Sequence, residues 1–194
     1  EVLDALLSAE RGWQAKPEQG NGVLVVGPSG SGKSSIVGVA RLRVASRRVL
    51  VVRPAVEGDS SVFAAVAHAL GTEASTESLT RILRSQRSVI ILDDLHAWFS
   101  PTPAGVDALE AFLALVAATQ TSTFWIASMP SEAFEVWSGT APLERAFAAI
   151  PHLHPVGRRE LEAVVSARHG LSGLELSFPT TLGTRLAQRL LRRS

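Results

Sequence analysis

Residues 27–34 constrain this chain more than any other segment. Their sequence is Gly-Pro-Ser-Gly-Ser-Gly-Lys-Ser, which fits the spacing G-x-x-x-x-G-K-[S/T] of a phosphate-binding loop at every fixed position. An apolar run at residues 23–26 precedes it, and residues 34–44 follow with helical spacing. This context predicts a loop between a buried strand and a helix. The segment therefore indicates an α/β fold and a bound nucleotide.

The chemistry of the loop explains why these residue types are needed. Glycines lack a Cβ, so the backbone can wrap tightly and aim its N–H groups at phosphates, and the N-terminus of the following helix favours the same anion. We expect Lys33 to reach the β and γ phosphates and the Ser34 hydroxyl to bind Mg²⁺. A Gly/Ser-rich turn without a ligand would explain the glycines but not the lysine and serine. The expected nucleotide-binding residues are Gly27, Pro28, Ser29, Gly30, Ser31, Gly32, Lys33, Ser34 and Ser35.

The composition of the chain supports the assignment of the phosphate loop and excludes several other classes of protein. The chain has 19 Lys and Arg residues, of which only Lys16 and Lys33 are lysines. A compact ammonium enters a phosphate cradle that a planar guanidinium fits poorly. The net charge of +1 argues against a surface dedicated to nucleic acid, and the absence of cysteine excludes disulfides and thiol chemistry.

The 194 residues, 46% of them hydrophobic, suffice for one well-buried core and a small appendage. No apolar run of membrane-spanning length and no signal peptide is found, so we expect a cytoplasmic protein. Because the chain starts at Glu1 and its last helical segment stops at Ser194, we expect a domain of a longer protein.

Strand and helix patterns alternate over most of the chain. The expected strands are 23–26, 48–53, 89–92 and 123–127, and the expected helices are 2–13, 34–44, 63–70, 79–83 and 109–116. This alternation predicts a doubly wound parallel sheet, whose ligand lies beyond the carboxyl ends of the strands. After Pro155 helical patterns occur without strands and a break is expected at 170–173, so we predict a nucleotide-binding core at 1–155 and the beginning of a small helical domain at 156–194.

The apolar run 89–92 leads directly into Asp93 and Asp94. Two acids at a strand end can also serve as a turn or a helix cap. Following the phosphate loop by about sixty residues, however, this element resembles the Walker B element of P-loop ATPases. The resemblance implies that Asp93 holds Mg²⁺ and that Asp94 polarises the attacking water.

From residue 2 to about residue 168, the chain resembles the AAA+ class and its relatives, the STAND signalling ATPases. The resemblance implies a five-stranded parallel sheet in which Ser128, at the tip of its strand, is the sensor 1 residue. The strand that carries Ser128 would lie between the strand that leads to the P-loop and the strand that leads to Asp93 and Asp94. A polar residue that simply ends a strand is the alternative. The predicted parts 1–155 and 156–194 correspond to the ATPase core and the partial helical lid of the family that the chain resembles.

The segment 143–147, followed by a last strand near 150–153, resembles the AAA+ segment that carries an arginine finger. The resemblance implies that Arg145 reaches the γ phosphate of a neighbouring subunit. An arginine in an intramolecular ion pair is the competing interpretation. Residues 183–185 resemble the sensor 2 segment loosely, with Arg185 as its arginine.

Three functions follow from these patterns. The first is Mg²⁺-dependent ATP binding with slow hydrolysis to ADP, which switches the conformation or assembly of a homo-oligomer or of flanking domains. The second is a nucleotide-gated scaffold that recruits protein or DNA without turnover, since Asp94 stands where vigorous AAA+ hydrolases carry glutamate. The third is a small-molecule phosphotransferase, for which no acceptor-binding segment is evident.

Other polar and aromatic residues are assigned no chemistry. His96, His152, His154 and His169 form no metal-binding pattern, and we expect His96 to be a loop residue, although it could line the site. Trp98, Trp125 and Trp137 are expected in the core or an interface.

Overall fold

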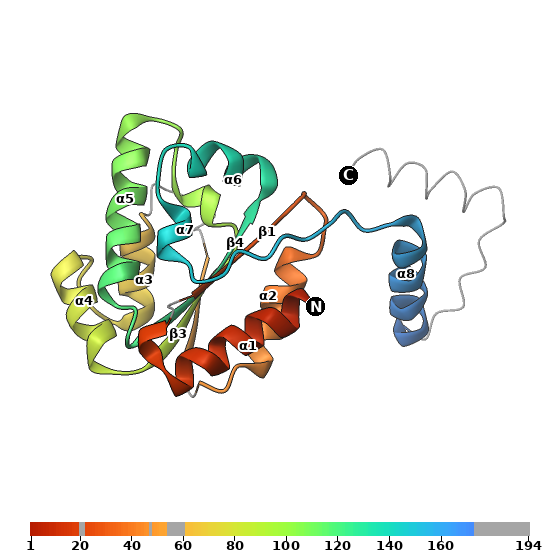
Figure 1. Ribbon diagram of the computed structural model, residues 1–194, viewed down its shortest axis with the longest axis horizontal. Coiled ribbons are helices and arrows are strands. Elements are labelled where there is room, and N and C mark those ends of the chain that lie inside the picture. Colours follow the sequence, from red (N-terminus) through yellow and green to blue (C-terminus); the bar gives the residue numbers. More distant parts are fainter. Residues whose placement is uncertain (20–21, 47, 54–60, 173–194) are drawn as a thin grey trace.

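The computed structural model describes residues 1–19, 22–46, 48–53 and 61–172, and Figure 1 shows its ribbon. Parallel strands and helices alternate along the core, as predicted. The elements, in chain order, are α1 (Val2–Ala15), η1 (Pro17–Gln19), β1 (Gly22–Gly27), α2 (Lys33–Arg43), β2 (Val49–Val52), α3 (Val62–Leu70), α4 (Thr76–Ser85), β3 (Ser88–Leu92), η2 (Leu95–Trp98), α5 (Pro103–Ala118), β4 (Thr123–Pro130), α6 (Ser131–Ser138), α7 (Leu143–Ala146) and α8 (Arg158–Ser172).

Local side-chain chemistry sets several helix boundaries. The hydroxyl oxygens of Ser61, Ser75 and Thr102 accept hydrogen bonds from backbone N–H groups three residues later, at the starts of α3, α4 and α5. Such caps satisfy donors that the first helical turn leaves unpaired. At the other end of α3, Gly71 adopts a left-handed conformation with φ 68°, which glycine tolerates without a steric penalty.

The sheet has the strand order β1-β4-β3-β2, and every neighbouring pair is parallel. The doubly wound α/β fold is therefore confirmed, and β4 lies between the strand of the phosphate loop and the strand that leads to Asp93. In the register, Gly27 pairs with Pro130 and Leu92 pairs with Ala127. The carboxyl ends of three strands thus meet at one edge of the sheet.

The place of the expected fifth strand is taken by residues 149–153, which run beside β1 through two isolated bridges. Leu24 N donates to Ala149 O at 3.0 Å, and Leu153 N donates to Val26 O at 2.7 Å. Between them, Pro151 accepts a bond from Val26 N at 3.0 Å but has no N–H to return. Among the described residues the sheet therefore has four strands and an irregular edge, rather than the five regular strands expected.

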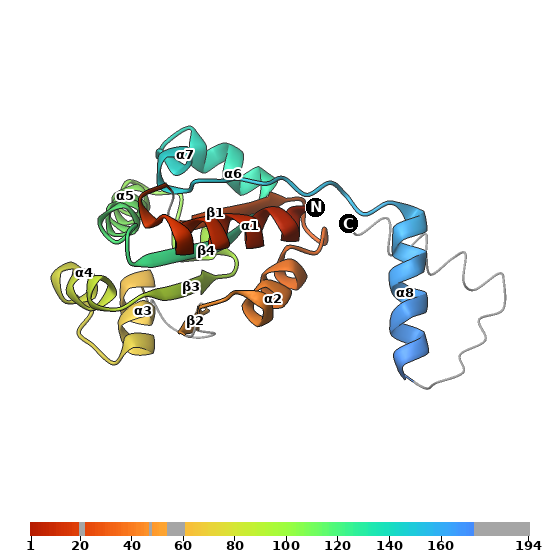
Figure 2. The ribbon, with the colours of Figure 1, turned by 60° about the horizontal axis from the view of Figure 1, so that its bottom comes forward.

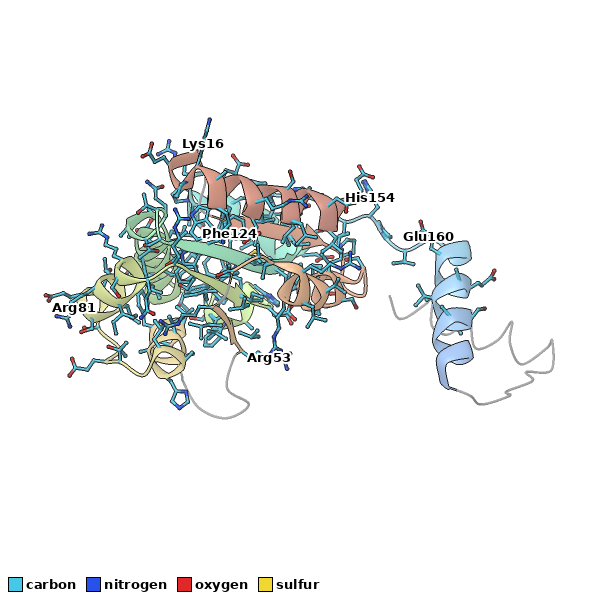
Figure 3. All side chains as sticks on the ribbon, turned by 90° about the horizontal axis from the view of Figure 1, so that it is seen from below. Lys16, Arg53, Arg81, Phe124, His154 and Glu160 are labelled. Atoms are coloured by element: carbon cyan, nitrogen blue, oxygen red, sulfur yellow. The ribbon has the colours of Figure 1, made fainter. Side chains whose placement is uncertain are left out.

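Helices cover both faces of the sheet, and the side chains of each strand alternate between two cores (Figure 2). Val23 and Val25 pack with α1 and α2, whereas Leu24 and Val26 pack with the cluster formed by α3 to α7. Figure 3 labels Phe124 inside the body, where its ring lies 5.6 Å from that of Trp13. This arrangement buries each strand on both faces, as its uniformly apolar sequence predicts.

The tryptophans predicted to be structural lie where expected. Trp125 is 0% exposed and donates from Nε1 to Thr119 Oγ1 at 3.2 Å, and Trp137 is 5% exposed. Trp98 is half-buried and packs against the same core.

Helix α8 stands apart from the body in both ribbon views, joined by a segment that includes His154 (Figures 1, 2 and 3). It continues through Gly170 to Ser172, so the break expected to start at Gly170 was wrong there. A helix tolerates an interior glycine at a cost of about 1 kcal/mol. The lid assignment for 156–194 remains a prediction, and the expected helix after residue 182, with Arg185, lies outside the described residues.

Candidate functional site

The loop between β1 and α2 has a backbone that only glycine accommodates at several positions. Gly30 and Gly32 have φ values of 80° and 93°, in the left-handed region that other residues rarely adopt. A Cβ added to Gly27 would lie 2.7 Å from Leu153 Cβ and 2.8 Å from Ser31 Oγ. The glycines therefore set the path of the loop and let the edge segment 149–153 approach it.

Lys33 is the first residue of α2, and its side chain is only 6% exposed. Its Nζ donates to Gly27 O at 2.9 Å and to Pro28 O at 2.8 Å. A buried ammonium needs such partners, but neutral carbonyls are weaker acceptors than phosphate oxygens. The ammonium is thus held inside the loop at the position where the motif predicts contact with phosphates.

A cavity of about 530 Å³ opens in front of the loop. Of the nine residues predicted to bind nucleotide, six line it, while Gly27, Pro28 and Ser31 do not. Gly27 and Pro28 instead present their carbonyls to Lys33, and Ser31 is 8% exposed with no partner for its hydroxyl. The lining residues are Ser29, Gly30, Gly32, Lys33, Ser34, Ser35, Asp94, His96 and Pro130.

The strand register brings Ser128 to the predicted acids. Ala127 pairs with Leu92, the last residue of β3, so Ser128 lies beside the position that Asp93 occupies. The alternation of side chains along strands puts both residues on the sheet face that α2 covers. The two strands and the phosphate loop therefore converge, as expected for the carboxyl edge of a parallel sheet.

Ser128 joins the two acids through one hydroxyl. Its Oγ donates to Asp93 Oδ1 at 2.5 Å and accepts from Asp94 N at 2.9 Å. Asp94 has φ 56° and is the only non-glycine residue with positive φ in the described part of the chain. Aspartate tolerates this conformation better than most residues. The serine bond thus holds the turn that presents Asp94 to the cavity.

Two details of the predicted acid region need correction. Ser128 does not lie at the tip of its strand, because β4 continues to Pro130, and its side chain is 0% exposed. Neither Ser128 nor Asp93 lines the cavity, whereas Asp94 does. Ser128 contacts the acids because β4 extends beyond the end of β3.

His96 and Pro130 line the cavity but were not among the expected site residues. His96 was noted in the sequence only because it follows Asp94 by two residues. Its Nδ1 is buried and has no hydrogen-bond partner among the residues that the structure describes. Pro130 carries no sequence signal for a site and reaches it because it pairs with Gly27.

Arg145 lies away from this cavity, on α7. Its side chain is exposed and borders a separate hollow of about 320 Å³ with Glu110 and Leu113 of α5. Across the described ranges, no salt bridge involves Arg145. The intramolecular ion pair considered as the competing interpretation is therefore not found there.

The donor set suits Mg²⁺ better than a softer metal. Across residues 1–19, 22–46, 48–53 and 61–172, no group of three His, Cys, Asp or Glu residues could hold a metal ion. Mg²⁺ is usually bound by one or two carboxylates together with substrate phosphates and water. The Ser34 hydroxyl and the Asp94 carboxylate fit this pattern, because they supply hard oxygen ligands at the nucleotide cavity, and Asp93 is next to Asp94 in the chain although it does not line the cavity.

In the described part of the chain, no helix combines the length and apolar character needed to cross a membrane.

The fold is similar to several solved AAA+ proteins. The Aeropyrum pernix ORC2 protein in ADPNP–ADP complexes matches 88% of this chain with a TM-score of 0.63 and 14% identity. The Thermotoga maritima RuvB point variant matches 91% with a TM-score of 0.55 and 19% identity. The Aeropyrum pernix ORC1 protein in complex with DNA matches 86% with a TM-score of 0.56 and 19% identity.

These matches cover 51%, 52% and 49% of the solved chains, so this chain spans about half of their length. At such low identity they establish the fold alone. No curated protein matches the chain in sequence.

A sequence model of a protein family identifies the family of this chain, which the fold comparisons do not. The model described as Novel STAND NTPase 1 matches residues 6–190, which include the phosphate loop, the two acids and Ser128. The nucleotide-binding architecture built by these residues is thus that of a STAND NTPase domain, and the chain belongs to the Novel STAND NTPase 1 family, nSTAND1.

Proposed function

We propose that this domain binds Mg²⁺-ATP in the cavity, hydrolyses it slowly, and uses its nucleotide state to switch the conformation or assembly of a larger protein. The observation that carries the proposal is that Lys33 and Asp94 line one and the same cavity. The buried Lys33 ammonium lies in the phosphate loop, and Asp94 lies on the turn held by Ser128.

The phosphate loop would bind and orient the polyphosphate. Gly30 and Gly32 let backbone N–H groups point into the cavity, and Lys33 would exchange its carbonyl partners for phosphate oxygens. The α2 N-terminus adds its partial positive charge. The similar ORC2 structure is of ADPNP–ADP complexes, which supports a nucleotide site in this fold.

The acids would carry the hydrolytic step. Asp94 would orient a water and accept its proton as the water oxygen bonds to the γ phosphorus and the bond to the β-γ bridging oxygen breaks, releasing ADP and phosphate. Ser34 and Asp93 would hold Mg²⁺, which neutralises charge on the phosphate oxygens. Ser128 fixes Asp93 and the Asp94 backbone, which makes it a positioning residue.

The identity of the second acid supports slow turnover. Aspartate is one methylene shorter than glutamate, and a misplacement of about 1 Å can cost two orders of magnitude in rate. The same observation favours a second candidate, a nucleotide-gated scaffold that does not hydrolyse ATP. The DNA in the ORC1 complex makes DNA one partner to test in that case.

Arg145 would act on a neighbouring subunit, because it is exposed and lies away from its own cavity. It would stabilise charge at the neighbour's γ phosphate. Light scattering with and without ATP tests this role. A monomer under both conditions, with an unchanged ATPase rate for Arg145→Ala, would contradict it.

Labelled-ATP binding with and without Mg²⁺ tests the nucleotide site itself. We expect Lys33→Ala to weaken binding at least about tenfold, because it removes charge-assisted bonds to phosphate. Lys16→Ala is the matched control, since Lys16 is the other lysine of the chain and is exposed. Equal binding by wild type and Lys33→Ala would refute the proposed function.

A further inference from the structure

The two walls of the cavity differ in hydrogen-bond donors. The phosphate-loop wall carries Lys33, three serine hydroxyls and the N-terminus of α2. The remaining lining residues are Asp94, His96 and Pro130, which we call the acid wall. An ionised aspartate only accepts hydrogen bonds, and proline has no N–H. Of these three residues, only His96 has a side-chain donor.

The acid wall contains Asp94, beside which the proposed function places the terminal phosphate. In P-loop proteins the loop backbone cradles the inner phosphates, and the outermost phosphate lies toward the acids. Asp94 on this wall, with Asp93 behind it, would repel a phosphate unless other groups offset their charge. A donor on the same turn as Asp94 meets that requirement.

The surroundings of His96 indicate which nitrogen is the donor. Its Nδ1 is buried without a partner, while the residue lines the cavity. Buried N–H groups without an acceptor are rarer in proteins than under-satisfied acceptors. A neutral imidazole carries its hydrogen on one nitrogen only. The unpartnered Nδ1 therefore favours the tautomer in which Nε2 carries the hydrogen.

We propose that His96 donates a hydrogen bond from Nε2 to the terminal phosphate of bound ATP and thereby distinguishes ATP from ADP. This inference rests on the proposed nucleotide site and adds the residue that reads the terminal phosphate. The interaction is absent with ADP, which has no γ phosphate. His96 thus links the nucleotide state to the turn that carries Asp94.

Three substitutions separate this role from a structural one. His96→Leu removes both ring nitrogens. His96→Gln places an amide N–H near the reach of Nε2, whereas the shorter His96→Asn places it near the reach of Nδ1. His68→Leu is the matched control, because His68 is exposed on α3 outside the cavity.

Affinities for β,γ-imido-ATP and for ADP, both with Mg²⁺, are measured by titration calorimetry on the full chain. We expect His96→Leu to weaken binding of the ATP analogue about tenfold or more, as for loss of a hydrogen bond to a charged group, and to leave ADP affinity within about twofold. His96→Gln should recover most of the loss, His96→Asn should not, and His68→Leu should match wild type.

The outcomes are distinguishable. Equal weakening for both nucleotides, no weakening, or identical behaviour of the Gln and Asn variants would overturn the role of His96 alone, provided that Lys33→Ala weakens binding as expected. If Lys33→Ala binds as wild type does, the nucleotide site fails and the inference fails with it. Should His96→Leu not fold, as judged by circular dichroism, the Gln and Asn pair decides the question.

Discussion

The two walls of the nucleotide cavity are built in different ways. The phosphate-loop wall comes from contiguous residues at the end of β1 and the start of α2, and its buried ammonium is paired within the loop. The acid wall combines residues from the turn after β3, from η2 and from β4. The Ser128 hydroxyl on β4 hydrogen-bonds to Asp93 and to the backbone of Asp94, which lie more than thirty positions earlier in the chain. A contiguous motif specifies the phosphate loop, whereas the placement of the acids depends on strand register.

The largest expected effect is a loss of ATP hydrolysis that leaves nucleotide binding nearly unchanged. Asp94→Asn should lower the ATPase rate about 100-fold or more, because an amide cannot accept the proton of water, while leaving nucleotide affinity within about threefold. Phosphate release and equilibrium binding measure the two quantities. Asp107→Asn, on the exposed side of α5, is the control. Equal rates for wild type and Asp94→Asn would leave the acid wall without a catalytic role and favour the scaffold.

The next effect tests whether the acid wall depends on Ser128. Ser128→Ala leaves Asp94 N without its acceptor and Asp93 without a donor, so we expect the free energy of unfolding to fall by about 1–3 kcal/mol. The matched control is Ser88→Ala, since Ser88 is 1% exposed and its hydroxyl has no partner. That variant should change stability by less than about 0.5 kcal/mol.

Denaturant unfolding compares these two serine variants. If Ser128→Ala and Ser88→Ala lower the free energy of unfolding equally, the hydrogen bonds of Ser128 to the two acids add no stability beyond that of a buried serine.

The smallest effects concern the backbone of the phosphate-loop wall. Gly30→Ala forces alanine to φ 80° and should cost about 1–2 kcal/mol. Gly38→Ala, within α2, places its Cβ in open space and should add about 0.5–1 kcal/mol of stability. Thermal unfolding of both variants tests whether Gly30→Ala lowers the stability and Gly38→Ala raises it. A neutral Gly30→Ala would show that the loop does not require its left-handed conformation.

Much of the fold could be predicted because hydrophobic periodicity and turn residues act locally. The four strands, the helices α1, α2 and α3, and the position of β4 between β1 and β3 agree with expectation. In contrast, α4 and α5 begin before the expected 79 and 109, β4 runs past the expected 127, and α6 was not expected. The irregular edge at Pro151 differs because a proline within the segment cannot donate to a ladder.

The site was predicted unevenly for the same reason. The phosphate loop is one continuous signal, so its residues were found from spacing alone. His96 was judged a loop residue and Pro130 was missed, since their position at the cavity depends on the η2 turn and on the pairing of β4 with β1. Neither the η2 turn nor the pairing of β4 with β1 is indicated by a local pattern in the sequence.

The sequence by itself determined the phosphate loop, the alternating α/β order and the identity of the acids, because these depend on residue types at short spacing. Only the tertiary structure decided that Ser128 holds the acids, that Asp94 rather than Asp93 lines the cavity, and that His96 lines the same cavity as the phosphate loop. The physical reason is register: parallel strands distant in the chain become neighbours only when the sheet forms, and a one-residue slip would turn Ser128 to the other face.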